Sequence, residues 1–159
     1  MEYSIVRVKK DNYFMFDNMI FYRKNNRDKN KDELKEKWDF AIEYATLESE
    51  NFYVFSAQTK NIFIGYISIT YIPKIGQEWN GHLNGFLYID ELWVNPNHRR
   101  KGIAEALLKK ADDLCQEKYI SGLRIGVNTT NDAGISLYKK CGYEQMFGTC
   151  LLMQKNIVI

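Results

Sequence analysis

The chain contains few of the residues that bind metals, form cross-links or break secondary structure. Its 159 residues include 3 cysteines, 2 histidines and 2 prolines. There is no Cys-x-x-Cys pair and neither histidine has a partner at metal-ligand spacing, so neither a disulfide framework nor a metal site is expected. The longest apolar stretch, IFIGYISITYI at 62–72, is too short to cross a bilayer as a helix.

An excess of charge of one sign is also missing. The 22 Lys and Arg residues nearly balance the 20 Asp and Glu residues, and a formal net charge of +2 is too weak to indicate a nucleic-acid partner. The N-terminal MEYSIVRVKK lacks the apolar segment of a secretory signal. We therefore expect a protein of the reducing cytoplasm, with neither a nucleic-acid nor a membrane partner.

What the chain does contain is a regular succession of apolar patterns without repeats or linkers, which predicts a single domain over 1–159. Strands are predicted over 3–8, 52–57, 62–72, 86–94, 122–128 and 143–154. Helices are predicted over 11–23, 32–47, 102–118 and 132–142. The order β-α-α-β-β-β-α-β-α-β predicts an α/β fold of mixed α+β type. Its central mixed sheet has about six to seven strands, with helices on both faces.

One short segment, NPNHRRKGIAEALL at 95–108, points to a ligand. Three cations, Arg99, Arg100 and Lys101, stand directly before a predicted helix, where the helix dipole already favours negative charge. This arrangement makes sense if the helix N-terminus binds a phosphate-like anion. Gly102 has no side chain, so the ligand could approach the backbone there, and the small side chain of Ala104 would not obstruct it. The alternative is a solvated basic turn whose repulsion is screened by salt.

Two motifs make the chain resemble the GNAT superfamily of N-acetyltransferases. The first is Arg99-x-x-Gly102-x-Ala104, which follows LWVNP and is similar to the family's [R/Q]-x-x-G-x-[G/A]. The second is NDAGISLYKKCGY at 131–143, which resembles the family's N-x-x-A-x-x-L-Y-x-x-x-G-[F/Y], although Gly134 stands at its small position. The resemblance covers about 86–145 well and the 52–72 hairpin by pattern only.

The resemblance implies that acetyl-CoA binds as a co-substrate where two parallel strands, 86–94 and 122–128, separate. Backbone groups at 92–94 would pair with the pantetheine arm, residues 99–104 would hold the pyrophosphate, and Asn131 would contact the cofactor further along. The implied cofactor-binding residues are Leu92, Trp93, Val94, Arg99, Arg100, Lys101, Gly102, Ile103, Ala104 and Asn131. Ligands in open α/β sheets do bind at such strand ends.

The resemblance also implies the catalytic groups. Tyr138 matches the family's tyrosine and would protonate the leaving thiolate, whereas a tyrosine at random would be a core aromatic. Glu91 would act as the base through a water. Strand alternation places the side chains of Asp90 and Glu91 on opposite faces, and both acids could instead be structural. A strand N–H near Leu92 or Trp93 would stabilise the oxyanion.

The expected function is transfer of an acetyl group from acetyl-CoA to a primary amine of a small, aminoglycoside-like molecule, by direct attack in a ternary complex. The alternatives are a protein N-acetyltransferase, a non-catalytic acyl-CoA-binding module and a nucleotide phosphate site. The charge run at 23–37 predicts a solvated loop, and in the family this region borders the acceptor site. Dimers are common among such relatives, so a homodimer is considered as well.

Overall fold

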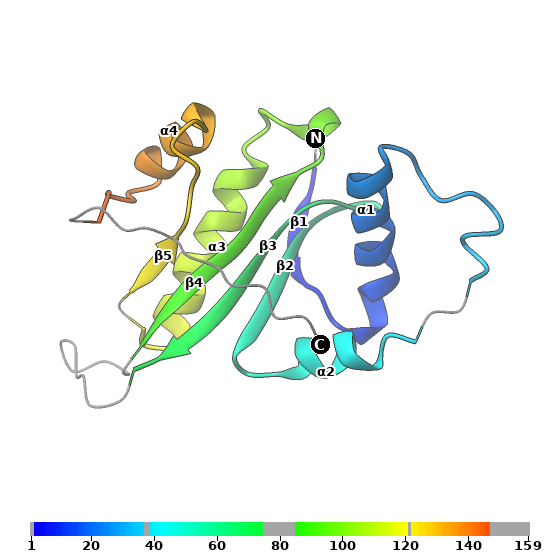
Figure 1. Cartoon of the computed structure of the whole chain (residues 1–159), viewed down its shortest axis with the longest axis horizontal. Helices are drawn as coiled ribbons and strands as arrows, with labels where there is room; N and C mark the ends of the chain where they lie inside the picture. The colour runs from blue at the N-terminus through cyan, green and yellow to red at the C-terminus, as the bar shows by residue number, and fades with distance from the viewer. Residues whose placement is uncertain (1, 37–38, 75–84, 121, 147–159) are drawn as a thin grey trace, which may run out of the picture. The chain divides into compact units, whose positions relative to one another are not determined.

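The computed structural model describes residues 2–36, 39–74, 85–120 and 122–146 (Figure 1). The chain divides into two compact units, Met1–Gly126 and Val127–Ile159. That the whole chain acts as one domain stays a prediction.

The first unit is built on a mixed five-stranded sheet. Its strands are β1 (Ser4–Arg7), β2 (Phe52–Thr59), β3 (Ile62–Pro73), β4 (Gly85–Val94) and β5 (Leu123–Ile125). They lie in the order β1-β2-β3-β4-β5, and β4–β5 is the parallel pair while the other three pairs are antiparallel. The predicted hairpin and the predicted mixed sheet are both confirmed. The sheet of the described residues has fewer strands than expected, because 143–146 form no strand and the rest of the predicted strand 143–154 lies outside the described residues.

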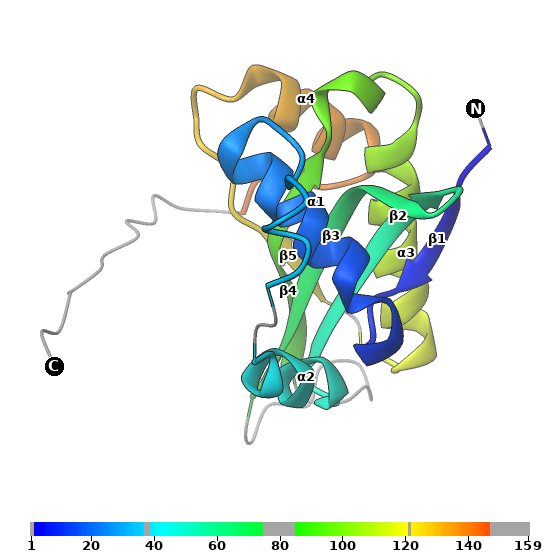
Figure 2. The same ribbon diagram turned by 90° about the vertical axis from the view of Figure 1, so that its right-hand side faces the viewer.

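The described residues form four α-helices, in the predicted order along the chain. They are α1 (Tyr13–Asn25), α2 (Ala41–Glu48), α3 (Ile103–Glu117) and α4 (Asp132–Lys140), with short 3₁₀ turns η1 (Lys10–Asn12) and η2 (Pro96–His98). Figure 2 shows α1 and α2 on one face of the sheet and α3 on the other. The first unit therefore has helices on both faces, as predicted. None of the helices within the described residues is long and apolar enough to cross a membrane.

The predicted helix over 32–47 is wrong in its first half. Residues 31–35 form turns, and the helix α2 begins only at Ala41. The Asn30 side-chain oxygen accepts the backbone N–H groups of Asp32 and Glu33, at 2.9 and 3.0 Å, as a helix N-cap does, but the turns that follow end at residue 35 because none of residues 31–35 is buried in the core. Leu34 is consequently 59% exposed instead of lying on a buried helix face.

Two leucine substitutions test this description of the core. Leu107 on α3 has 0% exposure, so Leu107→Ala should lower the free energy of unfolding by about 3 kcal/mol. Leu34→Ala removes the same atoms from an exposed turn and should change it by less than about 0.5 kcal/mol. Urea titrations of the two variants make the comparison. Equal losses would mean that Leu34 is packed in the core after all.

Candidate active site

Strand β4 is paired on both sides only over its first half. On one side it follows β3 along its whole length, from Gly85 to Val94. On the other side its parallel pairing with β5 ends at Ile89 and Ile125. Residues 90–94 therefore have no strand partner on that side within the described part of the chain. The backbone predicted to pair with an extended ligand, at 92–94, lies on this open edge.

A β-bulge interrupts β4 just where this open edge begins. The register pairs Ser68 with Glu91 and Ile69 with Ile89, so Asp90 is an extra residue in β4. An extra residue breaks the strict alternation of side chains between the two faces of a sheet. It also bends the strand locally, and bulges are over-represented next to active sites.

The bulge corrects the expectation that Asp90 and Glu91 point to opposite faces. Asp90 accepts a hydrogen bond from the Thr70 hydroxyl at 2.5 Å, and Glu91 accepts one from the Tyr66 hydroxyl at 2.5 Å. Tyr66 and Thr70 are four residues apart on β3 and so share one face of the sheet. Both carboxylates therefore reach the face that α1 and α2 cover. Only Glu91 lines the cavity described below.

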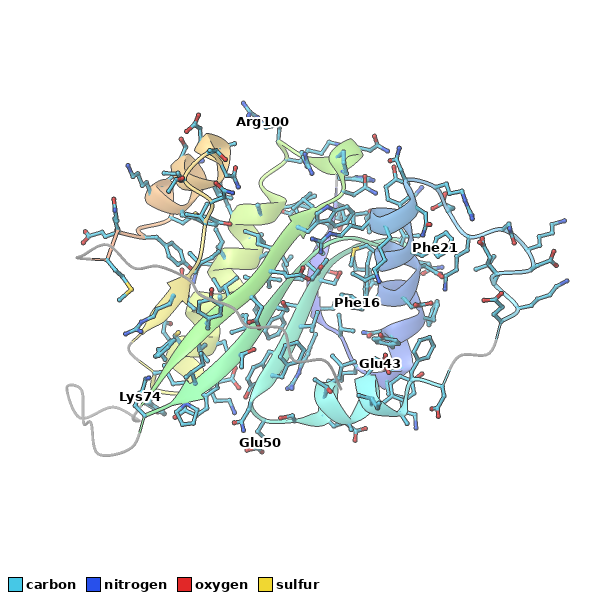
Figure 3. All side chains as sticks on the ribbon, viewed as in Figure 1. Phe16, Phe21, Glu43, Glu50, Lys74 and Arg100 are labelled. Carbon is cyan, nitrogen blue, oxygen red and sulfur yellow. The ribbon has the colours of Figure 1, made fainter. Side chains whose placement is uncertain are left out.

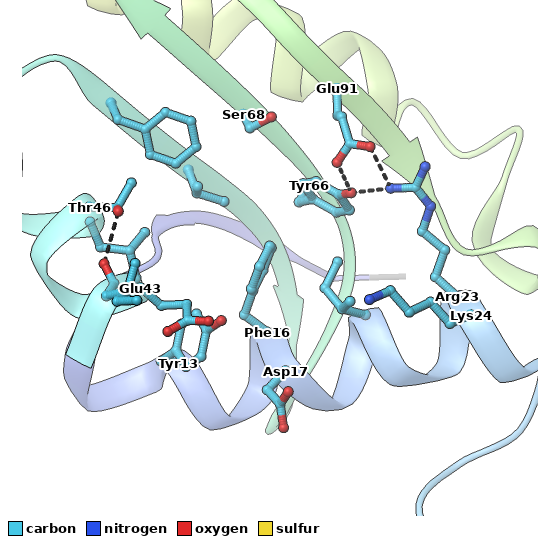
Figure 4. Close-up of a pocket in the computed structure, with 15 residues that line it drawn as sticks. Tyr13, Phe16, Asp17, Arg23, Lys24, Glu43, Thr46, Tyr66, Ser68 and Glu91 are labelled. Atoms are coloured by element: carbon cyan, nitrogen blue, oxygen red, sulfur yellow. Dashed lines mark hydrogen bonds and ion pairs between the residues drawn. The ribbon is translucent and has the colours of Figure 1, made fainter. Parts of the chain in front are cut away.

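Glu91 belongs to a network with a buried tyrosine and an arginine (Figure 4). The Tyr66 hydroxyl donates to Oε2 of Glu91, while Arg23 Nη1 lies 3.2 Å from Oε1 and also donates to the Tyr66 hydroxyl. Tyr66 is 1% exposed. Burial first, and then its hydrogen bond to Glu91, raise the pKa of Tyr66 far above its ordinary value. The phenol therefore stays protonated and holds one oxygen of the carboxylate in place.

A cavity of about 630 Å³ opens beside this network, between α1, α2 and the sheet. Its walls carry four aromatic side chains, those of Tyr13, Phe16, Phe52 and Tyr66. Three carboxylates also line it, those of Asp17, Glu43 and Glu91. Figure 3 shows Phe16 and Glu43 entering this region from α1 and α2. Aromatic faces and carboxylates together are the groups that recognise organic cations.

The charges around the cavity are unevenly arranged. Figure 4 shows Glu43 at one end, whereas Lys24 and Arg23 lie at the other end near Glu91. Asp17 forms an ion pair with Lys29. Burial first, and then the nearby charges of Glu43 and Asp17, raise the pKa of Tyr13 to about 12. The end of the cavity away from Glu91 is therefore the more negative one.

The basic turn that follows β4 uses two of its three cations to hold its own backbone. Arg99 Nε donates to the Val94 carbonyl at 3.1 Å, and Lys101 Nζ donates to the Asn97 carbonyl at 3.3 Å. Arg100 has a left-handed backbone, φ 61°, and its side chain projects outward from the turn (Figure 3). Of the three, Arg100 is thus the cation aimed most directly at solvent.

The start of α3 has the open backbone that an anion site requires. Gly102 occupies the N-cap position with φ 77°, and no side chain among the described residues caps the helix. The N–H groups of Ile103 and Ala104 lie in the first turn, where the helix supplies no partners. Apart from its chain neighbours, a Cβ on Gly102 would have only the Tyr3 hydroxyl of the described residues within 4 Å, at 3.8 Å. Space for a ligand therefore exists directly in front of these N–H groups.

His98 lies within the same turn. Its Nδ1 is buried and has no hydrogen-bond partner in the part of the chain that the structure describes. Burial first, and then the charge of Lys101, lower the pKa of His98. The imidazole is thus neutral at pH 7 and adds no fourth cation to the turn.

The second unit carries the two remaining predicted site residues. Asn131 is the N-cap of α4, and its side-chain oxygen accepts the Gly134 N–H at 3.0 Å. Tyr138 lies on α4 with its ring 5.9 Å from that of Tyr143. A phenol is protonated at neutral pH, and burial raises the pKa of Tyr138 further, so its hydroxyl is able to donate. The structure gives Asn131 a capping role, and the proposed catalytic role of Tyr138 stays a prediction.

Comparison with known proteins agrees with this fold and these motifs. The Acetyltransferase (GNAT) family matches residues 15–143, which is most of the chain. The chain belongs to this family. The resemblance inferred from the two sequence motifs is thereby confirmed.

Individual relatives add detail. The streptothricin acetyltransferase of Escherichia coli is 32% identical over 66 residues, covering 42% of this chain and 38% of that enzyme. The chain thus spans well under two thirds of the length of this curated relative. A crystal structure of an aminoglycoside acetyltransferase from an uncultured soil metagenomic sample matches with TM-score 0.72 and 21% identity, over 97% of this chain and 100% of that one. AAC(6')-Iy, solved with a CoA bisubstrate analogue, matches with TM-score 0.72 and 13% identity, over 98% and 100% of the two chains.

Sequence reasoning missed two members of the Glu91 network. Tyr66 lies within the apolar run 62–72, where an aromatic side chain is ordinary core, and Arg23 opens a charge run that predicts a solvated loop. No local motif marks either residue. The signal that could have drawn attention to Tyr66 is the register of β3 and β4, which brings it near Glu91 from 25 residues away.

Proposed function

We propose that this protein is an acetyl-CoA-dependent N-acetyltransferase that acetylates a primary amine of a small cationic molecule. One observation carries the proposal. Glu91 faces a cavity suited to a cation, and it does so from the half of β4 whose other edge is open to an extended ligand. A carboxylate that accepts a proton and a backbone edge that binds an acyl donor thus belong to one strand.

The residues at the end of β4 fit the acyl donor. The open edge at 92–94 can pair with the amide groups of the pantetheine arm, as an added strand would. Gly102, Ile103 and Ala104 offer uncapped backbone N–H groups for the pyrophosphate. Arg99, Arg100 and Lys101 add positive charge at the same turn, with Arg100 the one free to reach outward. Asn131 is proposed to contact the cofactor while capping α4.

The proposed reaction requires a neutral amine, although a free alkylamine has a pKa of about 10. Glu91 accepts the amine proton through a water, and the amine nitrogen then attacks the thioester carbonyl carbon. A backbone N–H at Leu92 or Trp93 stabilises the oxyanion. The carbon–sulfur bond breaks, Tyr138 protonates the leaving thiolate, and the proton that the nitrogen loses as the amide forms restores the Tyr138 phenol through solvent. The Tyr66 hydroxyl keeps the Glu91 carboxylate oriented throughout.

The acceptor we propose is a molecule with more than one amine, of the streptothricin or aminoglycoside kind. Two of the matched relatives act on such compounds by name. The cavity supports this class because Glu43 stands at the end opposite Glu91, where it can bind a second cationic group while the first reacts. The protein is also proposed to form a homodimer and to be located in the cytoplasm.

Substituting Glu91 and Asp90 in turn by their amides tests whether Glu91 is the catalytic base. Glu91→Gln should lower kcat/KM for the amine about tenfold, a modest loss because solvent can take over a proton relayed through water. Asp90→Asn is the matched control on the same sheet face, and it should leave kcat/KM within about twofold because Asp90 bonds to Thr70 outside the cavity. Thiol release measured against pH gives both values. If Asp90→Asn showed the larger loss, the base would be Asp90.

A further inference from the structure

Arg23 occupies a site that is built to hold a cation. Its guanidinium carbon lies 5.7 Å from the centre of the Tyr66 ring and 5.9 Å from that of Trp93. Its Nη1 contacts Glu91 Oε1 at 3.2 Å. We call the two rings and the Glu91 carboxylate the cation box. A carboxylate beside two aromatic rings attracts any organic cation, whether it is a guanidinium or an ammonium.

The cation in the box comes from the protein itself. Arg23 stands near the end of α1, which ends at Asn25 and is followed by Asn26 in a left-handed conformation. The Arg23 side chain reaches from there across to β4, and it lines the same cavity as Glu91 (Figure 4). It therefore fills the space beside Glu91 that the acceptor amine and the water relaying its proton would need.

The contact between Arg23 and Glu91 is weak enough to be exchanged. Their side chains are 36% and 49% exposed, and ion pairs at such positions are largely screened by water and salt. When Arg23 leaves, the Tyr66 hydroxyl loses the hydrogen bond that Arg23 donates to it but keeps its own hydrogen bond to the other oxygen of Glu91, because the Tyr66 phenol is buried. The box would thus keep its shape while its cation changes.

We propose that Arg23 is a resident cation of the acceptor site, which the cationic acceptor displaces from the box in order to bind. This inference rests on the proposed function for the identity of the acceptor, although the box itself does not. Arg23 then selects for acceptors whose positive charge can compete with a guanidinium. Neutral amines, or amines without a neighbouring cation, would leave Arg23 in place and bind weakly.

Binding of methylguanidinium tests the proposal without requiring turnover. Arg23→Ala empties the box, so this variant should bind methylguanidinium about tenfold more tightly than the unmodified protein, since the site no longer has to release its own cation. Calorimetry measures the affinity. Adding Glu91→Gln to Arg23→Ala should abolish the gain. If turnover is found, the KM for a diamine acceptor should fall in Arg23→Ala while kcat changes little.

Arg27→Ala is the matched control. Arg27 also pairs with a glutamate, Glu33, and also lies over an aromatic ring, that of Phe21 at 4.9 Å, but it does not line the cavity. Arg27→Ala removes the same charge as Arg23→Ala and should leave methylguanidinium binding unchanged. Equal affinities in Arg23→Ala and the unmodified protein would overturn the proposal, and so would a raised KM for the diamine. Tight methylguanidinium binding without any acetylation would contradict only the proposed function.

Discussion

Replacing Gly102 by tryptophan weakens acetyl-CoA binding at least about a hundredfold in a calorimetric titration, if the α3 N-terminus holds the pyrophosphate as proposed. The indole would fill the open space in front of the N–H groups of Ile103 and Ala104. It would therefore exclude the phosphates from the donors that bind them. Calorimetry reports this loss directly, because it requires no acceptor and no turnover.

The variant Gly102→Ala separates two possible causes of weaker acetyl-CoA binding, the size of the new side chain and the strain in the backbone. Both variants place a side chain at φ 77°, where residues other than glycine are strained, so both should lower the melting temperature to a similar degree. The alanine methyl group meets only the Tyr3 hydroxyl, at 3.8 Å, and should leave acetyl-CoA affinity within about tenfold of the original value. Equal loss of binding in both variants would show that strain, and not occupation of an anion site, causes the effect.

Removal of a single hydroxyl in Tyr138→Phe should lower kcat about a hundredfold, with the affinity for acetyl-CoA almost unchanged. A phenol is protonated at neutral pH, and burial raises the pKa of Tyr138 further, so it carries the proton to donate to the thiolate as the bond to carbon breaks. Phenylalanine keeps the ring and its packing against Tyr143. Steady-state kinetics with a thiol-detecting reagent measure kcat, and calorimetry measures the affinity.

Tyr143→Phe is the control for this substitution. It removes a hydroxyl from the ring that packs against Tyr138, at a position where the family motif accepts phenylalanine or tyrosine. It should leave kcat within about threefold. If Tyr138→Phe and Tyr143→Phe had equally small effects, the thiolate would take its proton from water and Tyr138 would be a packing residue.

Local patterns were sufficient to predict most of the fold. The apolar stripe of α3 and the paired runs of the β2–β3 hairpin are long and strongly periodic, so they specify their elements without tertiary information. The helix predicted over 32–47 was wrong in its first half because none of residues 31–35 is buried in the core, and a short helix in a protein depends on such packing. Apolar spacing does not reveal this, since it gives the face that Leu34 would occupy and not whether that face meets the core.

The candidate site was only partly predictable. The basic turn and Gly102 are contiguous in sequence, so a local motif was enough to predict an anion site there, and the structure shows that Gly102 begins α3 without a side-chain cap. The face that Asp90 occupies depends on a bulge in β4, which arises from the pairing of two strands and leaves no mark on either one alone. Arg23 and Tyr66 meet Glu91 only through tertiary contact, across 68 and 25 residues of chain. A single sequence cannot reveal such long-range contacts.

Acetyl transfer by this chain is tested most directly by incubating the purified protein with acetyl-CoA and a streptothricin or aminoglycoside acceptor, and following the acceptor by mass spectrometry. The expected product carries one acetyl group on an amine, and free CoA thiol appears in equal amount. Neither should form when acetyl-CoA or the protein is left out. The contradicting result is a protein that binds acetyl-CoA but acetylates no member of a panel of diamines, polyamines and peptides. That result would favour an acyl-CoA-binding module over an enzyme.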